Sequence, residues 1–182
     1  MSLEIVRLGA GAGPALVRRT SFTDERGAFS RLFAREELAA ANLAFEVVHV
    51  NHSVTRGRGT VRGFHYQRPP HAETKLVTCI RGAVLDVAVD IRADSPERFK
   101  PVSAELSAEN GTAMLIPEGF AHGFQALTDE VELIYLHSAA YAPEAAAGCR
   151  HDDPAIGFDW PLEPANLSER DRNWPLVREG VR

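Results

Sequence analysis

The chain has 182 residues, 45% of them hydrophobic and 25% charged, which predicts one soluble globular domain spanning residues 1–182. A net charge of −5 at pH 7 argues against a nucleic-acid partner, but it is compatible with a local basic pocket for one anionic ligand. No window has the apolar length of a membrane span, and the only cysteines, Cys79 and Cys149, form no disulfide framework, so we expect a cytoplasmic protein without a membrane partner.

Few regular elements are predicted in the first part of the chain. A flexible stretch, Gly9 to Pro14, precedes a short strand at Ala15 to Arg19. Asp24 to Gly27 is a turn signal, and Phe29 to Phe33 alternates weakly, as a strand does. Arg35 to Asn42 is rich in Ala, Glu and Leu, which predicts a short helix.

From Val47 onward, short β-like runs alternate with Gly, Pro, Asn and Asp. They include Lys75 to Ile80, Ala83 to Ile91, Val102 to Leu106, Thr112 to Ile116, Gly123 to Leu127 and Glu132 to Leu136. Many short strands separated by turn residues predict a mainly β fold, either a sandwich or a barrel. Leu85 to Ile91 alternates only in part, so we expect it to be buried on both faces. From Ala139 onward, we expect loops and short helices laid over the barrel.

Two motifs resemble those of cupins, small β-barrels that often hold a metal ion. Gly111, Pro117, Gly119 and His122 have the spacing of the second motif. In the first motif, metal-binding cupins have a second His two residues after the one that matches His65, and a Glu seven residues before the closing Gly82. This chain has Gln67 and Lys75 there. Because a lysine ammonium is a poor neighbour for a divalent cation, the sequence predicts a barrel with no metal ion, and we expect no other cofactor.

Four ionisable side chains are candidates for one site: His65, Lys75, His122 and Tyr135. If their runs are adjacent strands, all four can point into the barrel. A neutral histidine would serve as a base, a tyrosine as a proton donor, and an ammonium as a partner for a developing oxyanion, a set that suits proton abstraction beside a carbonyl. Taken singly, each has a plainer interpretation: a structural histidine, a core tyrosine or a surface lysine.

Several arginines are candidates for phosphate contacts, because the guanidinium group binds phosphate in a bidentate manner. They are Arg26, Arg56, Arg58, Arg62 and Arg170. The plainer interpretation, a solvated loop charge, is stronger for Arg56 and Arg58 than for Arg62, which shares a strand with His65.

The motifs together resemble those of dTDP-4-dehydrorhamnose 3,5-epimerases. The matching segments run from about Phe22 to Asp171: Arg26-Gly27 with Phe29, Asn51 to Ser53, Arg62 to Gln67, Lys75, Gly82, Asp86 to Arg92, Pro117 to Phe124, Tyr135, Tyr141 to Glu144, Asp153-Pro154, Trp160-Pro161 and Leu167 to Asp171. The resemblance implies a cupin-type double-stranded β-helix, a jelly-roll barrel, with short helices at its ends. It also implies a homodimer that acts on a dTDP-4-keto-6-deoxy-hexose without a metal ion.

The resemblance implies a role for each matching residue. His65 corresponds to the general base, Asp171 to the acid that orients it, Lys75 to the group that stabilises the enolate, and Tyr135 to the proton donor on the opposite face. The implied substrate contacts are Arg26, Asn51, Arg62 and Arg170 at the nucleotide and diphosphate, Tyr141 at the thymine, and His122 at the sugar.

Three positions depart from the family pattern at or near ligand contacts. His49 replaces a common Gln, Arg31 a frequent carboxylate, and Ala146 an acidic residue. We include Arg31 and His49 among the substrate-binding candidates. These departures leave open a relative that inverts C3 alone, in a deoxysugar pathway of secondary metabolism.

Two remoter alternatives also remain open at this stage. One is a metal-dependent cupin enzyme that uses His65, His71, Glu73 and His122 as ligands. The other is a non-catalytic cupin that binds a sugar nucleotide, although the joint presence of His65, Lys75, Tyr135 and Asp171 argues against it.

Overall fold

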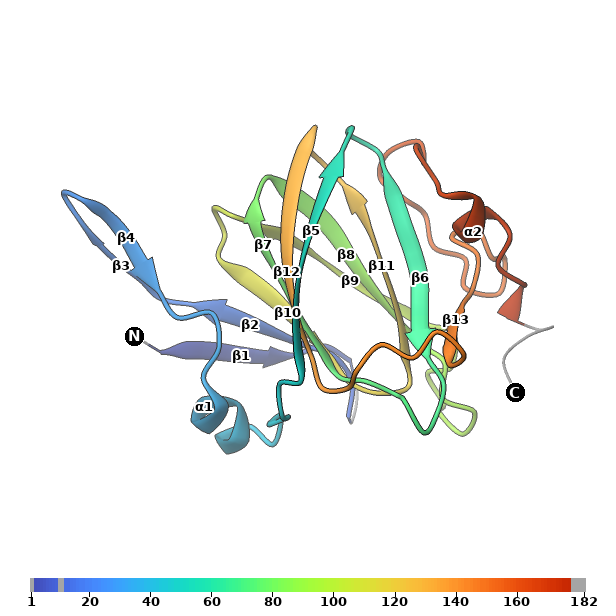
Figure 1. Ribbon diagram of the computed structural model, residues 1–182, viewed down its shortest axis with the longest axis horizontal. Coiled ribbons are helices and arrows are strands. Elements are labelled where there is room, and N and C mark those ends of the chain that lie inside the picture. Colours follow the sequence, from blue (N-terminus) through green and yellow to red (C-terminus); the bar gives the residue numbers. More distant parts are fainter. Residues whose placement is uncertain (1, 10–11, 178–182) are drawn as a thin grey trace.

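Two antiparallel sheets pack face to face in the computed structural model, which describes residues 2–9 and 12–177 (Figure 1). The six-stranded sheet has the order β1-β2-β10-β7-β12-β5. Its strands are β1 (Leu3–Arg7), β2 (Ala15–Arg19), β10 (Thr112–Ile116), β7 (Lys75–Arg81), β12 (Glu130–His137) and β5 (His49–Arg56). The strand order is far from the chain order, because the chain crosses repeatedly from one sheet to the other, as it does in a jelly roll.

The five-stranded sheet has the order β13-β6-β11-β8-β9. Its strands are β13 (Ala146–Gly148), β6 (Val61–Gln67), β11 (Phe120–Ala126), β8 (Ala83–Asp90) and β9 (Pro101–Ser107). The predicted cupin-type, mainly β fold is therefore confirmed. Among the described residues, no helix is both long and apolar enough to cross a membrane.

The main core fills the space between the two sheets. Val77 and Leu133 from the six-stranded sheet pack against Ala88 and Phe124 from the five-stranded sheet, and all four are at most 2% exposed. Side chains alternate along each strand, so the neighbouring positions face the other way. The arrangement leaves each sheet with one face toward this core and one face away from it.

The chain after β12 covers the outer face of the five-stranded sheet. Ile156 and Val177 pack there against Val87, Val89 and Ala121. This cover is why β8 is buried on both faces, as its incomplete alternation predicted. The predicted tail of loops and short helices is confirmed, with α2 (Glu169–Arg172) in it. The strand β13 in the same region was not predicted.

A separate hairpin projects away from the barrel (Figure 1). It consists of β3 (Ser21–Asp24) and β4 (Gly27–Ser30) and leads to α1 (Arg35–Ala40). The strand predicted at Phe29 to Phe33 is shifted, because β4 starts at the turn glycine and ends at Ser30. The observed helix α1 is two residues shorter than the predicted one. Asn42 has a positive φ of 56°, which is incompatible with a right-handed α-helix. Within the predicted flexible stretch, residues 10 and 11 lie outside the described residues.

Candidate active site

A cavity of about 270 Å³ in the barrel is lined by the four ionisable side chains that were predicted to form one site. Its lining residues are Asn51, Ser53, Arg62, His65, Lys75, His122, Phe124, Tyr135 and His137. A larger hollow of about 420 Å³ beside α1 has Arg7 as its one charged lining residue. Convergent polar groups identify a site better than size does, so we take the smaller cavity as the candidate active site.

The four ionisable candidates reach this cavity from both sheets. His65 lies on β6 and His122 on β11, where the two are cross-strand partners in the five-stranded sheet. Lys75 lies on β7 and Tyr135 on β12, in the six-stranded sheet. A ligand in the cavity would therefore have the two histidines on one side and the lysine and the tyrosine on the other.

His65 forms a dyad with Asp171. The His65 Nε2 atom lies 2.5 Å from Asp171 Oδ1, and the side chains are 41% and 5% exposed. Burial opposes the charge on Asp171, but the hydrogen bond and charge of His65, with the backbone N–H of Gly63, hold the pKa of this carboxyl group below its usual value. The Asp171 backbone N–H in turn donates to the Ser168 hydroxyl, which caps α2. An ionised, fixed carboxylate thus orients a histidine that stays open to a ligand.

His122 forms a second, deeper dyad with Asp86. Its Nε2 atom lies 2.7 Å from Asp86 Oδ1, and the side chains are 6% and 0% exposed. Asp86 is on β8, next to β11 in the sheet, so the dyad is built into adjacent strands. A buried polar pair of this kind fixes the imidazole ring at the floor of the cavity.

Tyr135 is held between two histidine rings. Its ring centroid lies 6.1 Å from that of His122, edge to face, and 5.8 Å from that of His137, nearly parallel. Burial, followed by the negative charge of Asp86, raises the pKa of Tyr135 above its ordinary value. The phenol is therefore protonated at neutral pH, as a proton donor must be.

Lys75 is paired inside the cavity wall. Its Nζ atom lies 3.1 Å from Glu73 Oε1, and the two side chains are 9% and 10% exposed. The second carboxylate oxygen of Glu73 lies 2.8 Å from His137 Nδ1. The cavity thus holds a base, a phenol and an ammonium, the set expected for proton abstraction beside a carbonyl.

The comparisons with known proteins agree with this chemistry. A family model described as dTDP-4-dehydrorhamnose 3,5-epimerase matches residues 11–179. A dTDP-4-dehydrorhamnose 3,5-epimerase of Sinorhizobium fredii is 46% identical over 166 residues, which cover 90% of this chain and 85% of the relative. The chain belongs to the dTDP-4-dehydrorhamnose 3,5-epimerase family. It is therefore an isomerase, as its sequence motifs predicted.

Solved structures extend the likeness to the whole fold of this family. A 4-keto-6-deoxy sugar epimerase from the novobiocin biosynthetic gene cluster of Streptomyces spheroides has a TM-score of 0.93 and 34% identity, covering 98% of this chain and 89% of its own. A dTDP-4-dehydrorhamnose 3,5-epimerase of Bacillus anthracis, solved with TDP and PPi bound, has a TM-score of 0.92 and 32% identity, covering 96% and 99%.

Four other predicted binding residues of this epimerase lie at or beside the cavity, on β5, β6 and α2. Asn51 and Arg62 line it, and Arg62 also donates to the backbone oxygen of Val54 at 3.2 Å. His49, exposed at the start of β5, is the cross-strand partner of His137. Arg170, on α2, lies over the ring of Trp174, which itself donates to Asp171.

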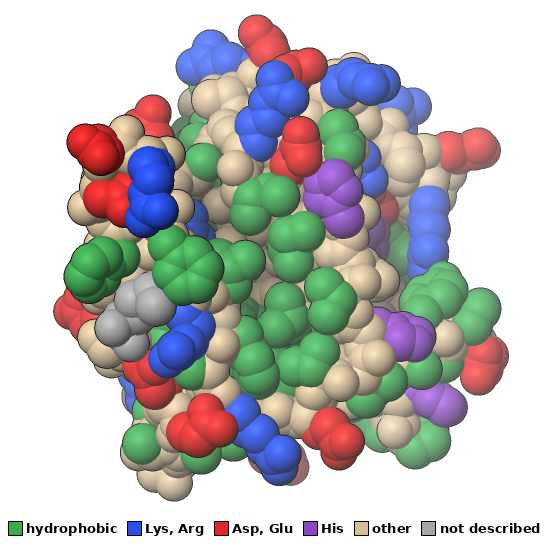
Figure 2. All heavy atoms as spheres, turned by 60° about the vertical axis from the view of Figure 1, so that its left-hand side comes forward, with side chains coloured by type: hydrophobic (Ala, Val, Ile, Leu, Met, Phe, Trp, Pro, Cys, Tyr) green, Lys and Arg blue, Asp and Glu red, His purple; other side chains and the backbone are tan. Residues whose placement is uncertain are grey.

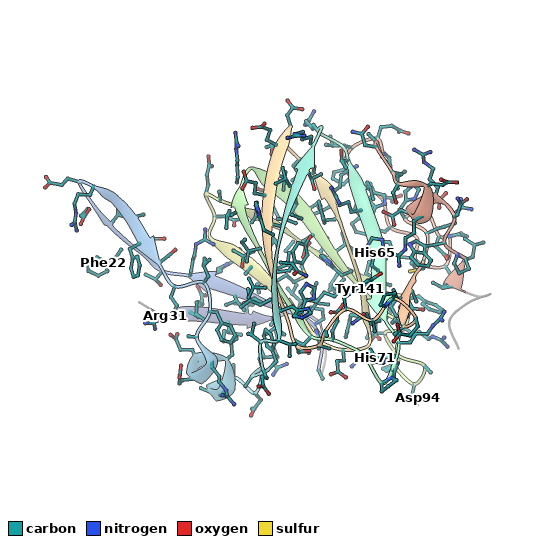
Figure 3. The ribbon with its side chains drawn as sticks, in the orientation of Figure 1. Phe22, Arg31, His65, His71, Asp94 and Tyr141 are labelled. Atoms are coloured by element: carbon teal, nitrogen blue, oxygen red, sulfur yellow. The ribbon has the colours of Figure 1, made fainter. Side chains whose placement is uncertain are left out.

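Three further predicted binding residues, like His49 and Arg170, are not among the residues that line the cavity. Tyr141, in the loop after β12, is 59% exposed. Arg26, at the tip of the hairpin, pairs with Asp24, and its side chain is 85% exposed. Arg31 pairs with Glu37 of α1 and lies on the hairpin side of the molecule, well separated from His65 (Figure 3).

The metal-ligand set weighed as an alternative does not converge in this family member. His71 lies in the loop between β6 and β7, where its nearest acidic partner is Glu144 at 3.9 Å. Glu73 is engaged by Lys75 and His137. Within residues 2–9 and 12–177, no three His, Cys, Asp or Glu side chains are grouped to hold a metal ion.

Sequence reasoning did not single out Ser53, Phe124 or His137 as part of the epimerase cavity. The signal was present in the alternation of strands, because residues two apart share a face. Ser53 follows Asn51, Phe124 follows His122, and His137 follows Tyr135 at that spacing. Glu73 precedes β7 and lies outside this alternation, and the sequence pointed to it only as a ligand of the alternative metal site.

Proposed function

We propose that this protein inverts C3 and C5 of a dTDP-4-keto-6-deoxy-hexose by removing a proton beside the C4 ketone and returning one from the opposite face. One observation carries the proposal: the His65–Asp171 dyad and Tyr135 enter one cavity from facing sheets. Inversion needs a base on one face of the sugar and an acid on the other, and this arrangement supplies both.

In this mechanism, His65 takes the proton and Asp171 stabilises the imidazolium that forms. General-base catalysis of this kind contributes about 10²–10⁴-fold. Electrons from the broken C–H bond move onto the ketone oxygen and form an enolate. The Lys75 ammonium, fixed in the cavity wall, faces that charge. Tyr135 then gives its proton to the carbon from the other side, and solvent restores both groups.

The nucleotide part of the substrate meets the positive rim of the cavity. Arg62 and Asn51 line the opening, and Arg170 stands on α2 directly beside the base–acid dyad. Guanidinium groups bind phosphate oxygens in a bidentate manner. The exposed ring of Tyr141 is available to stack on the thymine base, and His49 adds a polar group at the edge of β5.

A homodimer is the assembly that we propose for this enzyme. Phe22 and Phe29, cross-strand partners on the hairpin, are 72% and 67% exposed, and Val50 on β5 is 62% exposed. Hydrophobic side chains gather on the side of the molecule that carries the hairpin (Figure 2). A second copy of the chain would cover them. It would also receive Arg26, which lies in the turn of the hairpin that projects from the barrel (Figure 1) and does not line its own cavity.

The deciding experiment is turnover of dTDP-4-keto-6-deoxyglucose in deuterium oxide, followed by NMR. We expect deuterium at both C3 and C5 and formation of the doubly inverted sugar. Label at C3 alone would instead support the second candidate, a C3 epimerase. No label at either carbon would overturn the proposal and favour a protein that only binds the sugar nucleotide.

A further inference from the structure

Glu73 occupies a position between two side chains of the cavity wall. Its Oε1 atom lies 3.1 Å from Lys75 Nζ and its Oε2 atom lies 2.8 Å from His137 Nδ1. Lys75 and His137 are cross-strand partners on β7 and β12, and both line the cavity. Glu73 itself does not line it, so the carboxylate supports the wall from behind.

All three members of this Lys75–Glu73–His137 cluster are largely buried. Their side chains are 9%, 10% and 15% exposed. An ammonium group in such surroundings is costly unless a counter-charge accompanies it. Burial opposes the charge on Glu73 as well, but the hydrogen bond from His137 and the charge of Lys75 hold the pKa of Glu73 below its usual value. The carboxylate is thus ionised where the ammonium needs it.

Both contacts use the carboxylate as an acceptor, and this requirement restricts the residue that can stand at position 73. An ionised carboxylate accepts from Lys75 and from the His137 N–H at the same time. A glutamine at this position loses the negative charge that faces Lys75, and it keeps the His137 contact together with the Lys75 contact only if the imidazole changes tautomer.

We propose that Glu73 is the positioning residue for Lys75 and that His137 holds Glu73 in the orientation this requires. The inference rests on the proposed function, in which the Lys75 ammonium faces the enolate. A charge fixed in advance stabilises a transition state better than one that must move into place. Glu73 therefore acts on the rate of the chemical step through Lys75 and makes no contact with the sugar nucleotide, because it does not line the cavity.

The first test compares Glu73→Gln with the wild type and repeats the change in a Lys75→Ala background. We expect Glu73→Gln to lower kcat about 10- to 100-fold, with KM within about threefold, because a small displacement of a catalytic group has this effect. In the Lys75→Ala background, the same change should lower kcat by less than about twofold further, since two residues that act as a unit are not additive.

The second test uses two substitutions of His137 that remove the ring equally. The amide nitrogen of His137→Asn lies as many bonds from the backbone as Nδ1 does, so it can still donate to Glu73, whereas His137→Leu cannot. Both variants lose the ring that packs on Tyr135, but only Asn keeps a donor to Glu73, so we expect kcat of His137→Leu to be about tenfold lower than kcat of His137→Asn. This pair keeps the inference testable if Glu73→Gln does not fold, which circular dichroism will show.

The outcomes separate the inference from the function on which it rests. Additive losses in Glu73→Gln and Lys75→Ala, or equal losses in the two His137 variants, would overturn the inference while the wild type still exchanges deuterium. Absence of exchange in the wild type would overturn the proposed function and the inference with it.

Discussion

His65 is more exposed than its partner Asp171, and this difference suits their proposed roles. A base must meet the substrate, so its side chain has to open to the cavity, whereas the residue that orients it is best kept from water. Hydrogen bonds inside a protein are stronger than those exposed to solvent, because water competes for the same groups. The geometry leads to a prediction for each of the two proton-transfer residues.

Replacing His65 by Asn should remove turnover and leave the fold intact. We expect kcat to fall by about 10²–10⁴-fold, the usual contribution of a general base. The measurement is deuterium incorporation from solvent by NMR, with circular dichroism as the control for folding. Exchange at a near-normal rate in this variant would mean that another group removes the proton.

Replacing Tyr135 by Phe should separate exchange from inversion. His65 can still remove and return the proton on its own face, so deuterium enters while little epimer accumulates. Label and configuration are read from the same NMR spectra. The phenylalanine ring can keep the contacts that the Tyr135 ring makes with His122 and His137, so we expect little change in the free energy of unfolding. Inversion at the wild-type rate would assign the donor role to another group.

At the level of elements, the contact between β6 and β11 places both histidines. Gly63 has a φ of +127°, and a Cβ atom there would lie 2.5 Å from the backbone of Gly123. The pairing register shifts between His122 and Phe124, so the two strands approach closely at this point. The close approach sets His65 opposite His122, and it depends on two residues that have no side chain.

Replacing Gly63 by Ala should therefore disturb both stability and catalysis. Gly27→Ala is a matched control, because Gly27 has a similar φ of +132° and nothing within 4 Å of the added atom. Both changes carry the same backbone strain, and we expect Gly63→Ala to lower the free energy of unfolding by about 1–3 kcal/mol more. Thermal unfolding of the two variants makes the comparison. Equal destabilisation of the two variants would show that β6 and β11 can move apart at this point without a cost in the free energy of unfolding.

The elements that the sequence predicted well are those with a local signal. The composition of long apolar runs such as β8 predicts buried strands, and the two cupin motifs predict the barrel. The strand β13 reads Ala-Ala-Gly and has no apolar alternation, so only its pairing with β6 defines it. Glu73 meets His137 from a strand that is distant in sequence, and no local pattern reports this contact. For the same reason, the sequence grouped Arg26 and Arg31 with the cavity, whereas the path of the chain sets both apart from it.

The whole molecule gives a prediction about assembly. If Arg26 acts in the cavity of a second copy, Arg26→Ala and His65→Asn should each be inactive and regain activity when their chains are mixed. In a mixed dimer, one cavity then has an intact His65 and an intact Arg26. Random pairing makes this true of about a quarter of all cavities, so about a quarter of wild-type activity should return.

A control for this experiment mixes His65→Asn with Asp171→Asn. The two residues meet within one chain at 2.5 Å, so every cavity of a mixed dimer keeps one defect, and no activity should return. Sedimentation of the wild type should show a dimer. Absence of recovery in the first mixture, with dimers present, would place Arg26 outside the neighbouring cavity.

The dyad joins residues that are 106 positions apart, and this separation matters while the protein is being made. At roughly 5–20 residues per second, the ribosome adds Asp171 roughly 5–20 s after His65. Throughout that interval, the strands around His65 can pair, but the histidine has no acid to orient it. A nascent chain can therefore hold a nearly finished barrel without acting on the sugar nucleotides around it. If Asp171 orients His65 as proposed, activity begins only when α2 docks beside β6, and the docking of this helix sets the moment at which the enzyme starts to work.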